Sequence, residues 1–329
     1  MLDVCFKKMI QFHKNHNSMI TLLTHPNSHP FDSDLIVCGK NDTVVDIDSK
    51  NNKRNYYYHN QVNAGVYIVS NRIFDNYFLK PVKTDFEKDV VRYEIANKKV
   101  FSYHSSEYVK DAGTPERYYS VCADMASGIV ESKNLNHLQK CVFLDRDGTI
   151  NKYKGFIRKI EEIELEDGAA EGISDINKSG YLTIVITNQP VIARGEATIN
   201  DVDSFHKKLE TLLGEKGAYF DDLFYCPHHP DKGFDGEVKE LKIDCNCRKP
   251  KIGLILQAKE KYNIDLSNSY FVGDTTIDIQ TGINAGMKTI LVKTGQQGLD
   301  KKYNVEADYV IESLKYIDNV IKKGDKYEF

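Results

Sequence analysis

The chain has 329 residues, of which 41% are hydrophobic and 28% are charged, and its formal net charge is −4. One hydrophobic core rarely serves a chain of this length, so we predict two domains. The acidic balance argues against non-specific binding to nucleic acid, and no apolar run has the length of about 18 residues that a membrane span needs. Residues 1–20 lack the apolar core of a signal peptide, which predicts a cytoplasmic protein.

The first part of the chain reads as mixed α and β. Apolar residues at helical spacing predict a helix over 6–16, and apolar runs predict strands over 18–25 and 64–70. A proline near the start and a glycine at the end predict a helix over 115–128. The polar stretch that follows has no clear period, so we predict a linker at 129–139 between domains of residues 1–128 and 140–329.

In the second domain, strand patterns alternate with helix patterns. The predicted strands cover 141–145, 181–188, 222–227, 269–274 and 288–295. The predicted helices cover 169–180, 202–217, 253–264 and 276–286. This alternation predicts an α/β fold, a Rossmann-like parallel sheet with helices on both faces.

Polar side chains follow several of these strands. Asp145 and Asp147 come at the end of the first strand, Thr187 at the end of the second, and Asp274 at the end of the fourth. Lys249 precedes a helix in the same domain. Functional groups of open α/β sheets gather outside the carboxyl ends of the strands, so we expect these side chains to share one site.

Clustered carboxylates repel one another unless a cation lies between them, and Mg²⁺ prefers oxygen ligands. We therefore predict Mg²⁺ at Asp145, Asp274 and Asp147, the last through its backbone carbonyl, which leaves its side chain free. A carboxylate beside Mg²⁺ can attack phosphorus, and a second carboxylate can move the proton. Thr187 and Lys249 would hold the transferred phosphoryl oxygens. Gly148 permits a tight turn just after the two aspartates.

Four motifs of this domain, "DRDGT", "TNQ", "RKP" and "GDTTID", resemble those of the haloacid dehalogenase-like phosphatases, in the same order. The resemblance implies that Asp145 is the nucleophile, that Asp147 is the general acid and base, and that Asp274 is a Mg²⁺ ligand. It also implies that Asp278, one helical turn after Asp274, supports the site rather than binding the metal.

A second metal site is predicted by cysteines. Cys226-x-His228, sixteen intervening residues and Cys245-x-Cys247 offer three thiolates and an imidazole, the pattern of a closed structural Zn²⁺ site. His229 is the rival to His228, which matches the spacing of the other pair. The alternative interpretation is that the cysteines are buried and free. A zinc at this position would order the loop that carries Lys249.

The zinc motif narrows the resemblance to the subgroup that contains the heptose-bisphosphate and histidinol-phosphate phosphatases. The run "LDRDGTIN…TNQ…IARG…CPHHP…CNCRKP" is closer to the heptose enzymes. The resemblance implies substrate contacts with Tyr153, Lys154, Gly155, Phe156, Asn188, Gln189, Pro190 and Arg248. This chain departs from the family at Pro190-Val191, where a small Ser-Gly pair is common, and at Thr275, where lysine is frequent.

The N-terminal domain resembles the C-terminal half of the sugar-1-phosphate nucleotidyltransferases, through "VNAGVYIVS", "FEKDVV" and "VKDAGTPERYYSV". The resemblance implies that Asn63–Gly65, Glu87 and Lys88 face a sugar and that Asp111 is a metal ligand. Gly39 is the only glycine in residues 1–60, so no Gly-rich phosphate loop precedes this part. We therefore expect a truncated domain without nucleotidyl transfer, used for packing, self-association or docking of a separate half.

These patterns together predict a Mg²⁺-dependent phosphatase with a structural zinc. By resemblance, the substrate is D-glycero-D-manno-heptose 1,7-bisphosphate, hydrolysed at the 7-position, and the guanylyltransferase-like N-terminal part favours the α-anomer. The cationic Arg248 suits a bisphosphate anion. Two alternatives are a histidinol-phosphate phosphatase, whose substrate carries a cation, and a non-catalytic partner subunit of a sugar nucleotidyltransferase.

Overall fold

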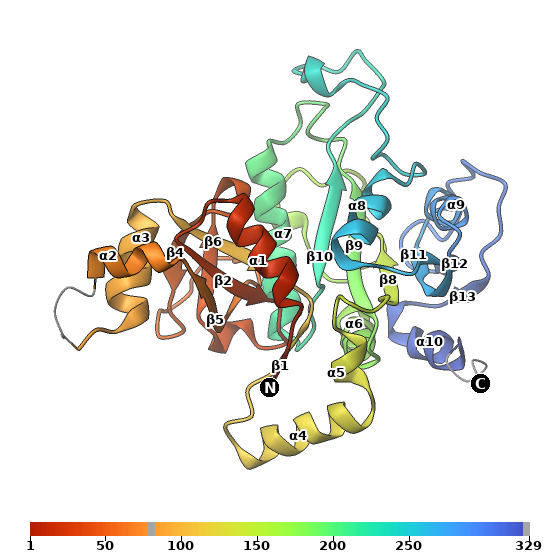
Figure 1. Cartoon of the computed structure of the whole chain (residues 1–329). Helices are drawn as coiled ribbons and strands as arrows, with labels where there is room; N and C mark the ends of the chain where they lie inside the picture. The colour runs from red at the N-terminus through yellow and green to blue at the C-terminus, as the bar shows by residue number, and fades with distance from the viewer. Residues whose placement is uncertain (78–82, 325–329) are drawn as a thin grey trace. The chain divides into compact units, whose positions relative to one another are not determined.

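The computed structural model describes residues 1–77 and 83–324, and its backbone divides into two compact units, residues 1–136 and 137–329 (Figure 1). The stretch 129–139, expected as a linker, contains helix α5 (Ile129–Ser132), and the boundary between the units falls inside it. Leu135 is buried, and its backbone N–H donates to Glu107 at 3.1 Å. Among the described residues, no helix combines the length and apolar character that crossing a lipid bilayer requires.

The N-terminal unit is built on a mixed sheet with the strand order β4-β3-β5-β2-β6. Its strands are β2 (Ile20–His25), β3 (Leu35–Cys38), β4 (Val44–Asp48), β5 (Val62–Val69) and β6 (Val100–His104), with a separate pair β1 (Leu2–Asp3) and β7 (Tyr108–Val109). Its helices are α1 (Phe6–Asn15), α2 (Phe74–Tyr77), α3 (Arg92–Ala96), α4 (Pro115–Ala126) and α5. The helices predicted over 6–16 and 115–128 are confirmed, as are the two strands, whereas β3, β4 and β6 were not predicted.

The C-terminal unit has a six-stranded sheet with the order β10-β9-β8-β11-β12-β13, in which every pair is parallel. The strands are β8 (Cys141–Leu144), β9 (Leu182–Asn188), β10 (Asp222–Cys226), β11 (Tyr270–Gly273), β12 (Lys288–Val292) and β13 (Tyr309–Ile311). The helices are α6 (Ala169–Lys178), α7 (Ile199–Glu215), α8 (Gly253–Tyr262), α9 (Thr276–Asn284) and α10 (Asp318–Gly324). The predicted parallel α/β fold is confirmed.

Helices cover both faces of this sheet. Val142 and Leu144 of β8 belong to one core cluster with buried residues of α6, α7 and α10. Phe143 points to the opposite face, because side chains alternate along a strand, and its ring stacks on Phe271 with centroids 6.4 Å apart. Helix α9 lies on that face, since a Cβ on its Gly282 would be 3.0 Å from Phe271. Burial on both sides explains why β8 is a continuous apolar run.

The strand order reverses at β8. From β8 the chain adds β9 and β10 on one side, and then returns to add β11, β12 and β13 on the other. In the register of the sheet, Leu144 lies beside Val185 of β9 and Val272 of β11. The crevice outside the carboxyl ends of β8 and its neighbours is therefore a topological switch point, where α/β proteins bind their ligands.

Candidate active site and metal centre

Three carboxylates meet at this switch point. Asp145 follows β8, Asp274 follows β11, and Asp278 lies in the first turn of α9. Each offers an oxygen within 4.8 Å of the others, and their residues are 9%, 1% and 1% exposed. Burial, and after it the charge of Asp278, raises the pKa of Asp145 to about 7. Burial and the charges of the other two raise the pKa of Asp274 to about 8.

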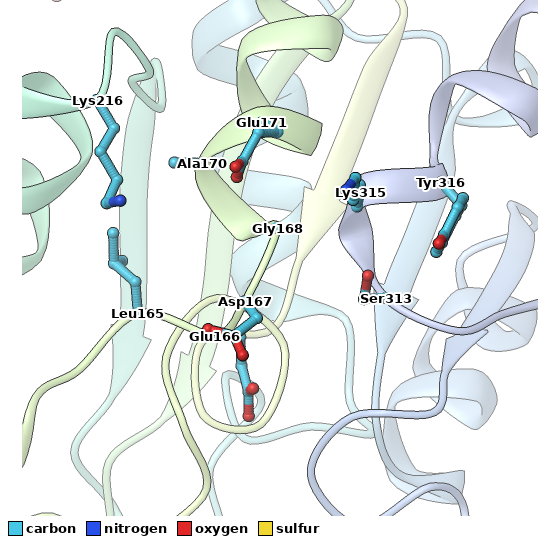
Figure 2. A pocket seen from close by; sticks show the side chains of 10 residues that line it. All are labelled: Leu165, Glu166, Asp167, Gly168, Ala170, Glu171, Lys216, Ser313, Lys315 and Tyr316. Carbon is cyan, nitrogen blue, oxygen red and sulfur yellow. The ribbon is translucent and has the colours of Figure 1, made fainter.

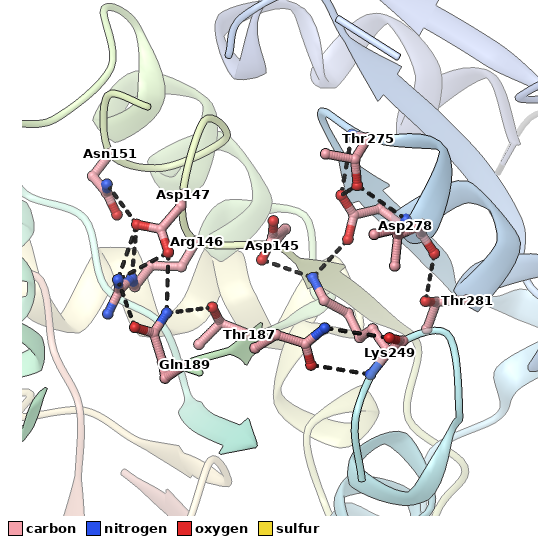
Figure 3. Close-up of polar contacts among 12 residues, drawn as sticks. Asp145, Arg146, Asp147, Asn151, Thr187, Gln189, Lys249, Thr275, Asp278 and Thr281 are labelled. Atoms are coloured by element: carbon pink, nitrogen blue, oxygen red, sulfur yellow. Dashed lines mark hydrogen bonds and ion pairs between the residues drawn. The ribbon is translucent and has the colours of Figure 1, made fainter. Parts of the chain in front are cut away.

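Lys249 supplies the positive charge of this cluster. Its Nζ lies 2.7 Å from Asp145 Oδ1 and 2.6 Å from Asp278 Oδ1 (Figure 3). Burial lowers the pKa of Lys249, but the two carboxylates outweigh burial and raise it above its ordinary value. Asn188 fixes the backbone of Lys249, because its side chain accepts from the lysine N–H at 3.0 Å and donates to the lysine carbonyl at 3.3 Å. When all three buried carboxylates are ionised, one lysine leaves excess negative charge, which suits a hard cation.

Asp147 faces another set of partners. Its carboxylate accepts two hydrogen bonds of 2.9 Å from the Nη2 atom of Arg146, a side chain that is fully buried. The side-chain amides of Asn151 and Gln189 each donate to it at 3.0 Å (Figure 3). The structure therefore brings Asp278, and not the Asp147 carboxylate, to Asp145 and Asp274. The sequence reasoning did not single out Arg146, although its place between the two aspartates was a signal.

Thr187 lies at the end of β9, and Arg248 directly precedes Lys249. The buried Thr187 hydroxyl accepts from Gln189 Nε2 at 2.9 Å. The Arg248 guanidinium donates to the His228 carbonyl at 3.3 Å, and burial lowers the pKa of Arg248. These hydrogen bonds fix the Thr187 side chain beside Gln189 and the Arg248 side chain beside the backbone of His228.

The segment predicted to contact substrate, residues 153–156, follows β8 and is largely exposed. Tyr153 and Phe156 are 45% and 42% exposed, and Lys154 pairs with Glu164 at 2.5 Å. Gly155 has a φ of 75°, in the region that favours glycine. On the neighbouring loop, Pro190 is buried.

Thr275, one of the departures from the family pattern, caps α9. Its hydroxyl accepts from the Asp278 backbone N–H at 3.3 Å and donates to the Asp278 carboxylate at 2.5 Å. This capping box holds the start of the helix and the Asp278 side chain together. The threonine thus acts on the acid cluster through Asp278.

Two glycines enclose the Asp274 carboxylate. A Cβ on Gly148 would lie 2.2 Å from Asp274 Oδ2, and a Cβ on Gly295 would lie 2.1 Å from the same oxygen. Gly148 has a φ of 83°, so it also makes the turn that the sequence predicted. The Gln296 N–H donates to this oxygen at 2.6 Å. Gly295 could not be found from sequence, because only the fold brings the loop after β12 to β11.

Three thiols and one imidazole form a second cluster. The Sγ atoms of Cys226, Cys245 and Cys247 are 3.2–3.5 Å apart, and His228 Nδ1 lies 3.2 Å from Cys247 Sγ. A tetrahedral zinc with bonds of about 2.3 Å would separate its sulfur ligands by about 3.8 Å, so these groups need little movement to bind one. The rival His229 instead faces Phe234, with ring centroids 5.8 Å apart.

The C-terminal unit also has a hollow of about 440 Å³ that none of these residues lines (Figure 2). Its walls come from the start of α6, the end of α7 and the segment around Lys315. They carry the mixed charges of Glu166, Asp167, Glu171, Lys216 and Lys315. The chemical groups needed for phosphoryl transfer lie at the switch point, so the hollow is not the candidate active site.

In the N-terminal unit, some of the residues predicted to face a sugar do lie together. Asn63 and Tyr67 of β5 both donate to Glu87 Oε2, at 3.3 and 3.2 Å. Asp111 is exposed and is paired with Arg117. In this structure its carboxylate therefore accepts from a cationic side chain.

Comparison with known proteins identifies both parts of the chain. The family model described as nucleotidyl transferase matches residues 1–128, and the model described as HAD-hydrolase-like matches residues 246–317. The D-glycero-beta-D-manno-heptose-1,7-bisphosphate 7-phosphatase of Escherichia coli K12 is 37% identical over 186 residues, which are 56% of this chain and 95% of that protein. The Haemophilus influenzae protein of the same name is 36% identical over 190 residues, 57% of this chain and 100% of that protein.

Solved structures give a similar match. The D,D-heptose 1,7-bisphosphate phosphatase of B. bronchiseptica, crystallised with magnesium and phosphate, is 29% identical and superposes with a TM-score of 0.49. The match covers 56% of this chain and 99% of that one. By its identity with the two curated relatives, the C-terminal part of the chain belongs to the heptose-1,7-bisphosphate 7-phosphatase family of phosphate monoester hydrolases, and it follows a segment that matches the nucleotidyl transferase family model.

Proposed function

We propose that the chain removes the 7-phosphate of D-glycero-D-manno-heptose 1,7-bisphosphate by way of an aspartyl-phosphate. The observation that carries this proposal is the buried pair of Asp145 and Lys249, 2.7 Å apart and beside two more carboxylates. A nucleophilic carboxylate, a cation for phosphoryl oxygens and oxygen ligands for Mg²⁺ are the parts that such a reaction requires. The curated relatives are named for this substrate and this position.

In the first step, an oxygen of Asp145 attacks phosphorus while the bond between phosphorus and the 7-oxygen of the sugar breaks. Asp147 gives a proton to the departing oxygen, and the phosphoryl group stays on Asp145. In the second step, Asp147 takes a proton from water, and the water oxygen attacks phosphorus. Phosphate leaves and the Asp145 carboxylate is restored. Thr187 and Lys249 bind the phosphoryl oxygens throughout.

The donor set at the switch point fits Mg²⁺, because it consists of buried carboxylate oxygens with a net negative charge. We assign the ion to Asp145, Asp274 and the backbone carbonyl of Asp147, with Asp278 holding Lys249. When bound, Mg²⁺ offsets the negative charge of the phosphoryl group. Arg146 orients the Asp147 carboxylate, so its contacts keep the proton carrier separate from the carboxylates that bind the metal.

The sugar and its second phosphate would contact residues on three loops around the cluster. Arg248 is the proposed partner of the 1-phosphate, because its guanidinium is a bidentate donor suited to phosphate. The remaining contacts are Tyr153, Lys154, Gly155, Phe156, Asn188, Gln189 and Pro190. Zinc at Cys226, His228, Cys245 and Cys247 would have a structural role, with no open coordination position.

The fused N-terminal domain suggests where the product goes. A nucleotidyl transferase relative next to a phosphatase suggests that the remaining sugar 1-phosphate is later activated by a nucleotide. The resemblance to guanylyltransferases favours the α-anomer, whereas the curated relatives are named for the β-anomer. The two anomers must therefore be tested side by side.

The test is phosphate release by the purified full chain with Mg²⁺ and zinc. The panel contains both anomers of the heptose bisphosphate, histidinol phosphate and fructose 1,6-bisphosphate at equal concentration. We expect the strongest turnover with the α-heptose bisphosphate and none by Asp145→Asn. Preference for histidinol phosphate would replace the substrate assignment. No release from any compound would favour the non-catalytic partner subunit.

A further inference from the structure

One arginine of the C-terminal unit lies against two aromatic rings. The guanidinium carbon of Arg194, in the loop after β9, is 4.5 Å from the ring centroid of Phe156 and 4.1 Å from that of Phe234. The Arg194 side chain is only 16% exposed, so it is held in this position. Phe156 belongs to the segment proposed to contact substrate. Phe234 belongs to the loop between the two pairs of zinc ligands, residues 229–244, which we call the insertion loop.

A shared carboxylate fixes the arginine to the Phe156 segment. Glu196 Oε1 lies 2.8 Å from Arg194 Nε, and Glu196 Oε2 lies 2.8 Å from Arg158 Nε. The Arg158 guanidinium also donates to the Phe156 carbonyl at 3.3 Å. Arg194 is thus linked to this segment in two ways. It contacts the Phe156 ring directly, and it shares the Glu196 carboxylate with Arg158.

The other side of the arginine is held by the insertion loop. The Val238 N–H donates to the Ala193 carbonyl at 3.0 Å. The backbone of Gly195 packs directly on the loop, since a Cβ there would lie 2.0 Å from the Gly236 carbonyl oxygen. The Nζ of Lys242 also lies over the ring of Phe234, 4.5 Å from its centroid.

The contact with Lys242 indicates that the Phe234 ring is held firmly in the insertion loop. Its side chain is 1% exposed, and its Nζ makes no hydrogen bond within the part of the chain that the structure describes. Its charge is offset by the Phe234 ring and by Glu237 at 3.5 Å. Glu237 in turn accepts from the Phe234 backbone N–H at 3.2 Å. A buried cation over a ring face gains more than an exposed one, so Phe234 anchors this loop.

We propose that Arg194 is a positioning residue, which couples the insertion loop to the Phe156 segment and so sets the affinity for the sugar end of the substrate. The proposal rests on the proposed function, because it concerns the sugar contacts of that site. Arg194 acts through Phe156, and the groups that transfer the phosphoryl group are held by other contacts. Loss of the Arg194 contacts with Phe156 and Phe234 should therefore weaken sugar binding and leave the chemical step intact.

The experiment compares two substrates with the full-length, zinc-loaded protein. The variants are Arg194→Met, which keeps the aliphatic stem, Phe234→Leu, which removes the ring, and Phe234→Tyr, which keeps it. Lys232→Gln, an exposed change in the same loop, is the matched control. kcat and KM are measured with the heptose bisphosphate and with p-nitrophenyl phosphate, which has no sugar. Bound zinc is counted for each variant.

We expect KM for the heptose bisphosphate to rise about tenfold in Arg194→Met and Phe234→Leu, in line with the loss of one or two cation–π contacts. Activity on p-nitrophenyl phosphate and zinc content should stay unchanged, and Phe234→Tyr and Lys232→Gln should behave like the wild type. The double variant Arg194→Met/Phe234→Leu should be no worse than either single variant, because both changes break one coupling.

Two outcomes would overturn the proposal. The first is an unchanged KM for the heptose bisphosphate in both single variants. The second is an equal loss on both substrates, which would indicate general damage to the fold. If the wild type itself releases phosphate from p-nitrophenyl phosphate but not from a heptose bisphosphate, then the proposed function fails instead.

Discussion

Four charged side chains at the switch point depend on one another. Asp145, Asp274 and Asp278 are buried together, and Lys249 alone offsets part of their charge. Because burial raises the pKa of Asp145 and of Asp274, these two side chains hold protons in the folded protein that the unfolded chain would release. The protonation of this group, and with it the affinity for a cation, should therefore change within the ordinary working range of pH.

The metal-free protein should lose stability as pH rises. The pKa of Asp145 is raised to about 7 and that of Asp274 to about 8, from a usual 3.8. Between about pH 4 and pH 8 the folded state thus binds more protons than the unfolded state, so the free energy of unfolding falls with rising pH. Thermal unfolding in Mg²⁺-free buffer, without a chelator that would remove zinc, should show a lower Tm at pH 8 than at pH 5.

Mg²⁺ should reverse this trend, because its ligands must be ionised. At a concentration 100 times its Kd, an ion that binds only the folded state adds about 2.7 kcal/mol to the free energy of unfolding. We expect the increase in Tm on adding Mg²⁺ to be larger at pH 8 than at pH 5. An equal increase at both values would contradict the assignment of the raised pKa values to the metal site.

Gly148→Ala should weaken Mg²⁺ binding without changing any charge. The new Cβ would overlap Asp274 Oδ2, and the positive φ would cost about 1–2 kcal/mol of stability. A metal ligand that is displaced by about 1 Å lowers turnover by about a hundredfold. Activity and the Mg²⁺-dependent increase in Tm should both be reduced. Gly217→Ala, at a positive φ with open space around it, controls for backbone strain.

At this site, sequence could predict the proximity of residues that directly follow strands of the sheet. Asp145 and Asp274 end neighbouring strands, so their meeting follows from the strand order. The direction of a side chain after the strand end does not follow from sequence. Asp147 turns to Arg146 because the guanidinium and Gln189 offer it four hydrogen bonds, and this preference depends on packing that only the fold supplies.

Among the elements, the insertion loop shows how a segment with little regular structure is ordered. Its glycines and charged residues give it no apolar core of its own. Order therefore comes from the proposed zinc ligands at its ends, from the Phe234 contacts and from the backbone contact at Gly195. The loop continues into Arg248 and Lys249, so its order bears directly on the lysine that we propose binds the phosphoryl group.

Removal of zinc should lower thermal stability and activity together. The ligand set contributes binding energy only in the folded state, so its loss reduces the free energy of unfolding. After chelation and re-addition of Mg²⁺, we expect a lower Tm and a reduced kcat. If both are retained while metal analysis shows that zinc is gone, the structural role of the metal is wrong. Cys245→Ser should reproduce the effect of chelation.

Sequence patterns predicted most elements of the C-terminal unit, because its strands are apolar runs separated by helical patterns. The helix predicted over 202–217 begins earlier, at Ile199, since Thr198 and Asp201 form a capping box that was not recognised. Strand β13 was missed because it is short and exposed at the edge of the sheet, with Val310 53% exposed. A short exposed strand has no apolar pattern that separates it from a loop.

At the scale of the whole molecule, the phosphatase chemistry belongs to one unit. Asp145, Lys249, Asp274 and the proposed zinc ligands all lie within residues 137–329. The Escherichia coli K12 and Haemophilus influenzae relatives match this part over 95% and 100% of their own length. The N-terminal unit has its own sheet and its own core cluster around Ile20 and Val100.

The separate unit of residues 137–329 should therefore fold and keep its phosphatase activity. We expect kcat and KM for the heptose bisphosphate to lie within about threefold of the values for the full chain, since this unit has its own core and contains all the proposed catalytic and substrate-binding residues. The separate N-terminal unit should form no nucleotide sugar from a sugar 1-phosphate and a nucleoside triphosphate. A tenfold loss of activity in the phosphatase unit would show that residues 1–136 contribute to the site.

The spacing of the three thiols has a consequence for how the protein must be handled. Sulfur atoms 3.2–3.5 Å apart are in non-bonded contact, and two of them would have to approach to about 2.05 Å to form a disulfide bond. Exposure of the zinc-free protein to air should link two of them as a disulfide, which leaves too few ligands for zinc to return. Bound zinc would then also protect its cysteine ligands from oxidation. Zinc removed by a chelator could be restored only in the presence of a reductant.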